Sequence, residues 1–201
     1  MDNIFYYDNG EVWGKLLADD EDVNGIRCGK GSWVWFHGNG GISSCEPVQD
    51  VTIDGIPCRA GMRIYFHENC RLMRCYLPED GLIAGIPVRS DTFLLFHDNG
   101  RLSACRLSRD IEYNGVKCRS GAWIGFYGDG SVKRCVIAGN MLIQGVLFSP
   151  GDWAAFHQNG RLENCKLTRN MVIQGIEYSS GDILLFDENG RLSEKIRNPF
   201  V

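Results

Sequence analysis

Histidine is the residue type in this chain whose spacing first suggests chemistry. All four histidines follow a phenylalanine, and they recur at a 30-residue spacing that is skipped once: His37, His67, His97 and His157. A ladder of imidazoles could bind a metal ion or respond to pH near 6.5. With two to four strands per interval, however, successive histidines would lie roughly 10 to 19 Å apart, at about 4.8 Å per strand. One metal ion could not bridge them, and Tyr7, Tyr127 and Asp187 occupy the same column, so we expect no metal and no cofactor.

Eight of the nine cysteines fall into two columns as well. One evenly spaced column contains Cys45, Cys75, Cys105, Cys135 and Cys165. A second column contains Cys28, Cys58 and Cys118 in three copies and Val88, Phe148 and Tyr178 in three others. The second column therefore requires apolar bulk, and cysteine serves there as a small hydrophobic residue.

Neither a zinc site nor an obligatory disulfide framework fits this arrangement. No C-x-x-C pair is present, so the cysteine spacing that is typical of zinc fingers is absent. The number of cysteines is odd, and the first residues, MDNIFYYDNG, lack the basic start and apolar core of a secretory signal. We therefore expect a cytoplasmic protein with reduced, buried thiols, although stacked copies could bring neighbouring cysteines within bridging distance.

Catalytic motifs are missing from the sequence too. We find no P-loop, no G-x-G-x-x-G, no nucleophile elbow and no Ser-His-Asp or His-Cys arrangement beyond what the 30-residue spacing explains. An enzyme built from repeats would break the period to install one asymmetric site. The breaks are Cys70 for glycine, Pro47 for leucine, Asp91 for glycine and Gly125 in an aromatic strand. They form no catalytic set, so we predict that the protein is not an enzyme.

The elements that must position these columns are repeats. FHENCRLMRCYL, FLLFHDNGRLSACRL and FHQNGRLENCKL are versions of one phrase, whose opening aromatic residue keeps a 30-residue period without a slip. These openers are Tyr6, Phe36, Phe66, Phe96, Phe126, Phe156 and Phe186. A continuous period leaves no room for a linker. We expect a single domain over residues 1–201, with an N-terminal half unit and six full 30-residue units.

Each phrase contains a turn directly after its opener. In a two-residue Asn-Gly loop, Phe96 would face Ser103. A three-residue loop, with Gly100 in the left-handed conformation of a G1 bulge, pairs Phe96 with Leu102 instead and brings two apolar columns together. We therefore predict the three-residue loop. Cys70, which replaces this glycine in one copy, must then adopt a positive φ.

A second turn lies half a unit away, in VTIDGIPC, IEYNGVKC, MLIQGVLF and MVIQGIEY. Apolar residues flank its x-Gly pair, as Tyr113 and Val116 do, and a two-residue turn places them on one buried face. Each unit thus contains about four short strands, and no segment has a helical period. The predicted fold class is all-β: an open, solenoid-like array of short antiparallel hairpins, with a small-bladed β-propeller as the alternative.

The stretch NGVKCRSGAWIGFYGDGSVKRC, residues 114–135, resembles the variant MORN repeat. In that repeat an Asn-Gly, a Gly, an aromatic pair, another Asn-Gly and an apolar residue follow in order. The resemblance extends over nearly the whole chain, but the unit here is longer and its second aromatic residue is mostly His. It implies an elongated, twisted array of β-hairpins in a family associated with scaffolding, protein assembly and sometimes membrane contact.

The strand before each opener is apolar on both sides: WVWF, RIYF, FLLF, WIGF, WAAF and ILLF. One side contains the phenylalanine column and joins the core. The other side, with the histidine column and adjacent arginines, forms a candidate interaction face. It comprises Trp33, Trp35, His37, Tyr65, His67, Phe93, Leu95, His97, Trp123, Tyr127, Trp153, His157, Arg71, Arg101 and Arg161. This face either packs against the short hairpins of its own unit or is an exposed aromatic stripe.

Three functional hypotheses follow from this composition. Because Trp, Tyr and Arg dominate protein interfaces, the main hypothesis is a protein-interaction scaffold or assembly module. A carbohydrate-binding module that uses the tryptophan column as a stacking platform is the alternative, and membrane-surface contact is a further one. The net charge of −4 and the lack of a polybasic cluster argue against anionic lipid and nucleic acid.

The two ends of an open array are sheet edges that could template association. The C-terminal copy includes Lys195 and Pro199, and the N-terminal copy has Lys15 followed by the acidic run 18–22. Charged residues and proline at a sheet edge disfavour pairing with another chain. We therefore expect a monomer, or at most a dimer through the aromatic face.

Overall fold

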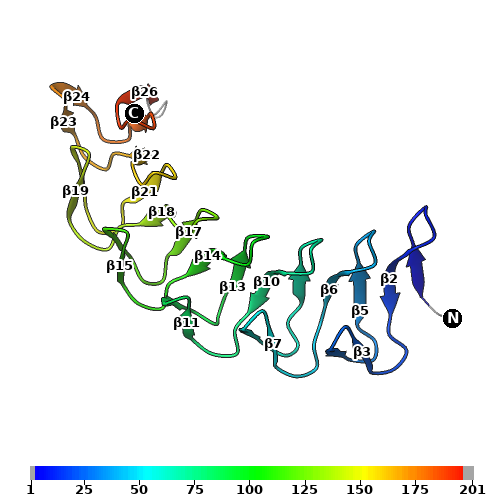
Figure 1. The fold of residues 1–201 in the computed structure, drawn as a ribbon. Helices are drawn as coiled ribbons and strands as arrows, with labels where there is room; N and C mark the ends of the chain where they lie inside the picture. Colours follow the sequence, from blue (N-terminus) through cyan, green and yellow to red (C-terminus); the bar gives the residue numbers. More distant parts are fainter. Residues whose placement is uncertain (1–2, 197–201) are drawn as a thin grey trace. The chain divides into compact units, whose positions relative to one another are not determined.

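The computed structural model describes residues 3–196, and all regular structure in that range is β-structure. The strands alternate between one long antiparallel sheet and a series of small two-stranded hairpins (Figure 1). No helix is present in residues 3–196, which confirms the predicted all-β class. Pro199 and the side chain of Lys195 lie outside the described part of the chain.

The long sheet takes its strands in chain order. They are β1 (Ile4–Tyr6), β2 (Val12–Leu16), β5 (Trp33–Phe36), β6 (Ile42–Cys45), β9 (Ile64–Phe66), β10 (Leu72–Tyr76), β13 (Phe93–Phe96), β14 (Leu102–Arg106), β17 (Trp123–Phe126), β18 (Val132–Val136), β21 (Trp153–Phe156), β22 (Leu162–Lys166), β25 (Ile183–Phe186) and β26 (Leu192–Ile196). Because the order begins with β1 and ends with β26 in a single sheet, the array is open and is not a propeller of separate blades.

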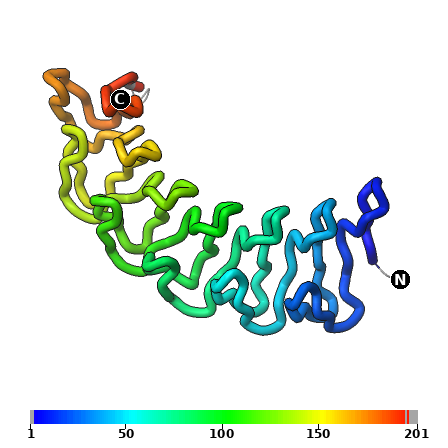
Figure 2. The backbone as a smooth tube through the Cα atoms, in the orientation of Figure 1, coloured from blue at the N-terminus to red at the C-terminus, as the bar shows by residue number. Residues whose placement is uncertain are grey.

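The small hairpins connect successive pairs of long-sheet strands. They are β3 (Glu21–Val23) with β4 (Ile26–Cys28), β7 (Val51–Ile53) with β8 (Ile56–Cys58), β11 (Gly81–Ile83) with β12 (Ile86–Val88), β15 (Ile111–Tyr113) with β16 (Val116–Cys118), β19 (Met141–Ile143) with β20 (Val146–Phe148), and β23 (Met171–Ile173) with β24 (Ile176–Tyr178). Each repeat thus contributes four strands, and the backbone follows the same path in successive repeats (Figure 2). The chain divides into two compact units, Met1–Ser103 and Ala104–Val201, called here the N-terminal and C-terminal halves.

The predicted openers all occupy one structural position, the last residue of the first strand in each long-sheet pair. The loop that follows has the predicted three residues. Phe36 pairs with Ile42, and the Gly40 amide donates to the His37 carbonyl over 2.9 Å. Gly40 has a φ of 80°, and Cys70, at the equivalent position of the next repeat, has a φ of 64°. The predicted register and the positive φ of this cysteine are both confirmed.

A second irregularity, which the sequence did not reveal, lies in the returning strand. In β10, Leu72 pairs with Phe66, whereas Arg74 pairs with the residue directly before that phenylalanine. Met73 is therefore an extra residue, a β-bulge that shifts the alternation of side chains. As a result Leu72 and Cys75, three positions apart, are both buried, where a regular strand would bury every second residue.

The small hairpins have the two-residue turns that the sequence predicts. At Asn114 and Gly115, φ is 49° and 75°, and a type I′ turn requires such left-handed values at both positions. Tyr113 pairs with Val116 across this turn. The other five hairpins pair their flanking residues in the same way.

The core lies between the phenylalanine column of the long sheet and the apolar face of the hairpins. The ring of Tyr113, from hairpin β15–β16, meets the ring of Phe126 edge-on, with centroids 5.6 Å apart. Ile64 and Leu94, in the same face of the sheet as the openers, are 1% and 0% exposed. The hairpins therefore cover the side of the sheet that carries the phenylalanines.

Replacing Gly160 tests the three-residue loop. Gly160 has a φ of 80°, and a Cβ there would meet nothing within 4 Å. Gly160→Ala should therefore destabilise the protein by about 1 kcal/mol through backbone strain alone. Gly38→Ala is the matched control, because Gly38 also has open space around it but has no left-handed φ. Denaturant melts give both values, and equal losses of stability would contradict the loop assignment.

A pair of truncations tests the bulge. Leu72 is 1% exposed, so Leu72→Ala should lower the free energy of unfolding by about 2 to 5 kcal/mol. Met73→Ala removes a side chain of similar size from the bulge, where the residue is only half-buried, and should cost about 1 kcal/mol or less. Urea titration of the two variants measures the difference. A larger loss for Met73→Ala would mean that the register of β10 is wrong.

Candidate interaction surface

The small hairpins cover one face of the long sheet, and the aromatic column lies on the other. In β17, Ile124 and Phe126 are buried, whereas Trp123 is 39% exposed. Trp153, in the same position of β21, is 40% exposed. The predicted aromatic residues are therefore not packed under the hairpins of their own repeat. We call the side of the sheet that carries them the outer face.

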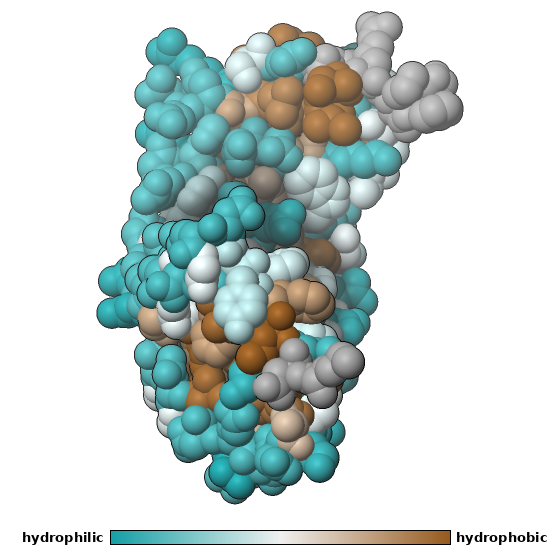
Figure 3. Space-filling model, turned by 90° about the vertical axis from the view of Figure 1, so that its right-hand side faces the viewer, coloured by the Kyte–Doolittle hydropathy of each residue, from teal (hydrophilic) through white to brown (hydrophobic). Residues whose placement is uncertain are grey.

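In the N-terminal half, two predicted tryptophans gather with two residues that the sequence analysis did not include. The rings of Phe5 and Trp33 stack with centroids 5.2 Å apart, and Trp33 stacks on Trp35 at the same distance. Trp13 meets Trp35 edge-on at 5.1 Å. We call these four residues the N-terminal aromatic cluster. Figure 3, which looks toward the N-terminal end of the sheet, shows hydrophobic and pale side chains together there among hydrophilic ones.

Gly14 makes room for this cluster. It pairs with Trp35 on one side and with Phe5 on the other. A Cβ on Gly14 would lie 2.6 Å from two carbon atoms of the Trp35 ring, so the ring rests directly against the backbone of β2. Because no side chain separates them, the rings of Phe5 and Trp35 approach to 6.3 Å and lie within 10° of parallel.

Farther along the outer face of the N-terminal half, Arg74 lies among three aromatic rings. Its guanidinium carbon is 4.3 Å from the ring centroid of Phe93, 5.2 Å from that of Tyr65 and 5.9 Å from that of Tyr76. Leu95 pairs with Arg74 on the neighbouring strand. We call Tyr65, Arg74, Tyr76 and Phe93 the Arg74 cluster.

The charge of Arg74 is only partly matched inside the protein. Its Nη2 donates to the hydroxyl of Tyr76 over 3.3 Å, while its buried Nε has no hydrogen-bond partner. Among residues 3–196, no carboxylate lies within ion-pair distance of this guanidinium. The ring faces of the cluster stabilise the cation through their quadrupoles, but no carboxylate in the described part of the chain neutralises it.

The predicted tryptophans of the C-terminal half have different surroundings. Trp123 pairs with Arg106, and Trp153 pairs with Val136. Two positions after Trp123, the strand has Gly125 where β5 has a tryptophan. The outer face therefore contains fewer rings in this half than in the N-terminal half.

The histidine column joins successive repeats. The Nε2 atoms of His37, His67 and His157 lie 3.0, 3.0 and 2.8 Å from the carbonyl oxygens of Phe66, Phe96 and Phe186. Because a carbonyl only accepts hydrogen bonds, each of these Nε2 atoms carries the proton and donates. The hydroxyls of Tyr7 and Tyr127 donate in the same way to the carbonyls of Phe36 and Phe156, both over 2.9 Å. His97 is half-buried in the same column.

The predicted arginines Arg71 and Arg161 form hydrogen bonds at the ends of the strands. Arg71 donates from Nη1 to the carbonyl of Asn99 over 2.9 Å, and Arg161 donates to the carbonyl of Asn189. Each bond reaches the loop of the next repeat. Arg101 is exposed at the corresponding place in its own loop. The structure therefore assigns Arg71 and Arg161, like the histidines, to links between repeats.

Sequence reasoning missed Phe5, Trp13 and Arg74 for identifiable reasons. Phe5 and Trp13 belong to the truncated first copy, which has the weakest match to the phrase. Arg74 directly follows the bulge, so regular alternation does not give its face. Leu142 and Leu147 were missed as well: they pair across hairpin β19–β20 and are 69% and 44% exposed. Their signal was two leucines at positions where hairpins β3–β4 and β15–β16 have pairs of charged residues.

All nine cysteines are free thiols, and eight of them are buried. The prediction of buried thiols is confirmed for these eight, and Cys70 is exposed. Burial raises the pKa of Cys105 to about 12, and chiefly the same cause raises the pKa of Cys165 to about 12. These two thiols therefore stay protonated and unreactive at neutral pH.

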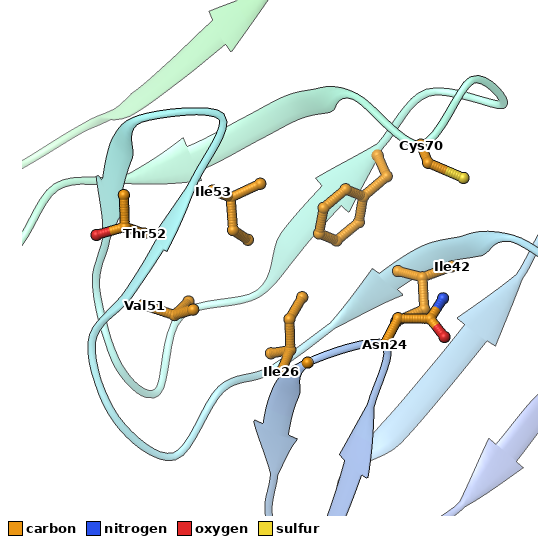
Figure 4. A pocket seen from close by; sticks show the side chains of 9 residues that line it. Asn24, Ile26, Ile42, Val51, Thr52, Ile53 and Cys70 are labelled. Atoms are coloured by element: carbon orange, nitrogen blue, oxygen red, sulfur yellow. The ribbon is translucent and has the colours of Figure 1, made fainter.

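A cavity of about 280 Å³ lies in the N-terminal half, between hairpin β3–β4, strand β7 and the long sheet (Figure 4). Its lining is largely apolar and includes Ile26, Ile42 and Ile53. Asn24 and the exposed Cys70 are also part of the lining. Catalytic pockets combine an apolar lining with several converging polar groups, and the lining of this cavity has no such set.

Within residues 3–196, no three His, Cys, Asp or Glu side chains are arranged to hold a metal ion, and no helix is long and apolar enough to cross a membrane. The sequence matches no protein-family model, and comparison with curated proteins gives no match. The inference of function must therefore start from the outer face.

Substitution of His37 tests the links between repeats. His37→Phe keeps a planar ring but leaves the Phe66 carbonyl without its donor, which should cost about 0.5 to 1.5 kcal/mol of unfolding free energy. His37→Tyr should restore most of the stability, because Tyr7 and Tyr127 make the same bond through their hydroxyls. Chemical denaturation measures both. Equal stability of the two variants would show that this hydrogen bond contributes nothing.

Proposed function

We propose that the protein is a non-enzymatic interaction module whose outer face binds another protein. The observation that carries this proposal is the N-terminal aromatic cluster. Its members Phe5 and Trp13 are 47% and 46% exposed although their side chains are large and apolar. Exposed apolar patches of this kind mark interaction sites, and aromatic residues with arginine are the commonest anchors of protein interfaces.

The Arg74 cluster indicates the chemistry of the partner. A carboxylate placed over Arg74 would complete the ion pair that the described residues do not supply, and a charge-assisted hydrogen bond of this kind is stronger than a neutral one. Arg63, directly before strand β9, adds a second cation near this cluster, with its Nη2 4.0 Å from Glu46. The face thus fits a partner that presents apolar side chains and an acidic residue.

Pre-organisation of the face supports the same function. The aromatic cluster lies on β1, β2 and β5 and the Arg74 cluster on β9, β10 and β13. These strands belong to one sheet, with β6 between the two sets. His37 and Arg71 connect successive repeats at the strand ends. Anchors on a rigid frame lose little conformational freedom on binding, so more of the contact energy becomes affinity. The resemblance to MORN repeats, which are associated with scaffolding, is consistent with this role.

A glycan is the weaker candidate, for a geometric reason. A sugar stacks on a free ring face. In the aromatic cluster Phe5 stacks on Trp33 and Trp33 stacks on Trp35, so these rings cover each other. Their exposed parts favour the side chains of a protein over the flat face of a sugar ring.

The full chain can be tested by selecting peptides from a displayed random library. We expect the selected peptides to combine aromatic or aliphatic residues with Asp or Glu. Calorimetric titration of one such peptide should show at least a tenfold loss of affinity for Trp13→Ser and for Arg74→Gln, the size typical of interface anchors. Trp153→Ser is the matched control, because it removes an exposed tryptophan from the C-terminal half, and should leave the affinity unchanged.

Two results would contradict this proposal. One is a peptide that binds equally well to Trp13→Ser and to the parent protein, because its site would then lie elsewhere. The other is a library that yields no acidic or aromatic consensus while an array of glycans gives binding that Trp13→Ser abolishes. The second result would establish the carbohydrate-binding alternative.

A further inference from the structure

The buried cysteines meet in pairs, which their separation in sequence does not suggest. In three repeats, a cysteine at the end of a small hairpin lies against a cysteine of the long sheet. The thiols of each pair lie close enough to shift a pKa within the pair: Cys28 with Cys45, Cys58 with Cys75 and Cys118 with Cys135. The separation along the chain is the same in every pair, and all six residues are buried.

The backbone holds each pair together. The Arg59 amide, directly after Cys58, donates to the carbonyl of Tyr76, directly after Cys75, over 2.8 Å. The residues that follow Cys118 and its partner make the same bond, also over 2.8 Å. In the first repeat, Cys28 forms a β-bridge with Pro47. The backbone pairing thus places the two cysteines of each pair on neighbouring strands in all three repeats.

The chain itself shows that packing does not require this contact. Val88 occupies the hairpin position in the repeat of Cys105, and Phe148 occupies it in the repeat of Cys165. All four of these residues are buried. A hydrocarbon side chain beside one thiol therefore fills the core as well as a second thiol does. Packing alone does not explain why three repeats have two thiols at these positions.

We propose that the three cysteine pairs are oxidisable dithiols, and that hydroperoxide closes each pair into a disulfide within its own repeat. The thiolate of one cysteine attacks a peroxide oxygen, forming a sulfenic acid and releasing hydroxide or alcohol. The second thiol then attacks the sulfenic sulfur and releases water. Two thiols and one hydrogen peroxide thus give one disulfide and two waters, and no other reactant is needed.

The first pair has the features of the most reactive one. The neighbouring Cys45 thiol lowers the pKa of Cys28 against the opposing effect of burial, and the positive charge of Arg63 acts in the same direction as Cys45. The Cys28 thiol and burial raise the pKa of Cys45. Cys28 is thus the nucleophile of its pair, and Cys45 resolves the sulfenic acid. Hydrogen peroxide is small, and opening of the short hairpin β3–β4 would admit it.

Closure of the disulfides would raise the thermal stability of the protein. Each new bond ties a small hairpin to the long sheet, for example β4 to β6. A covalent link across such a loop restricts the unfolded chain and stabilises the folded one. The oxidised protein should therefore unfold at a temperature several degrees higher than the reduced protein, and a thiol reductant should reverse the shift.

The test uses the full chain with Cys70→Gly, which removes the exposed thiol and restores the glycine found at this loop position in the other copies. The folded protein is treated with hydrogen peroxide, unfolded, alkylated and digested for peptide mass mapping. We expect peptides that join Cys28 to Cys45, Cys58 to Cys75 and Cys118 to Cys135. Cys105 and Cys165 should be alkylated and serve as internal controls.

A variant provides the matched control. Cys28→Val gives the first repeat the combination that the chain already has at Val88 and Cys105, so it should fold. This variant should lose the link to Cys45 and keep the other two. Alkylation of the paired cysteines to the same extent as Cys105 would overturn the proposal. So would links that join cysteines of different repeats.

Discussion

Hydrogen bonds from the residue after an opener to the carbonyl of the next opener, donated by Tyr7, His37, His67, Tyr127 and His157, set the register of the repeats. His67 reaches the carbonyl of Phe96 over 3.0 Å, and Tyr127 reaches that of Phe156 over 2.9 Å. A ring fixed at a strand end reaches a carbonyl at one separation, so an inserted residue between two openers would break the bond. This constraint accounts for a 30-residue period without a slip. It also explains why His and Tyr exchange in one column, since each places a donor at the tip of a planar ring.

The same bond decides which residues are available for function. A histidine or arginine that links repeats, as His37 and Arg71 do, has its donor already committed to a backbone carbonyl. The openers and the hairpins fill the core from the other side of the sheet. The residues of the N-terminal aromatic cluster lie on the opposite side of the sheet from the core and pack mainly on one another. These residues could therefore contact a partner without loss of the hydrogen bonds and core contacts that hold the repeats together.

The parts of this structure that sequence could predict are those with a local chemical signature. The Gly at the left-handed position of each loop and the x-Gly pair of each hairpin have such signatures, and they fixed the strand pairs and the all-β class. The bulge at Met73 has none, because its side chain suits either face, so the face of Arg74 could not be derived. The contact between Cys28 and Cys45 depends on how the hairpin folds back on the sheet, which the one-dimensional spacing does not specify.

Two adjacent positions of the opener strands differ in what folding requires of them. The core position of the opener strands contains Val34, Ile64, Leu94, Ile124, Ala154 and Leu184, all apolar and buried. The next position, on the outer face, contains Trp35, Tyr65, Leu95, Gly125, Ala155 and Leu185. Gly125 pairs across the sheet on both sides as Trp35 does, so the backbone does not require a ring there. Because the fold is satisfied by a residue without a side chain, folding does not explain the rings at this position in the N-terminal repeats, which agrees with the proposal that these rings contact a partner.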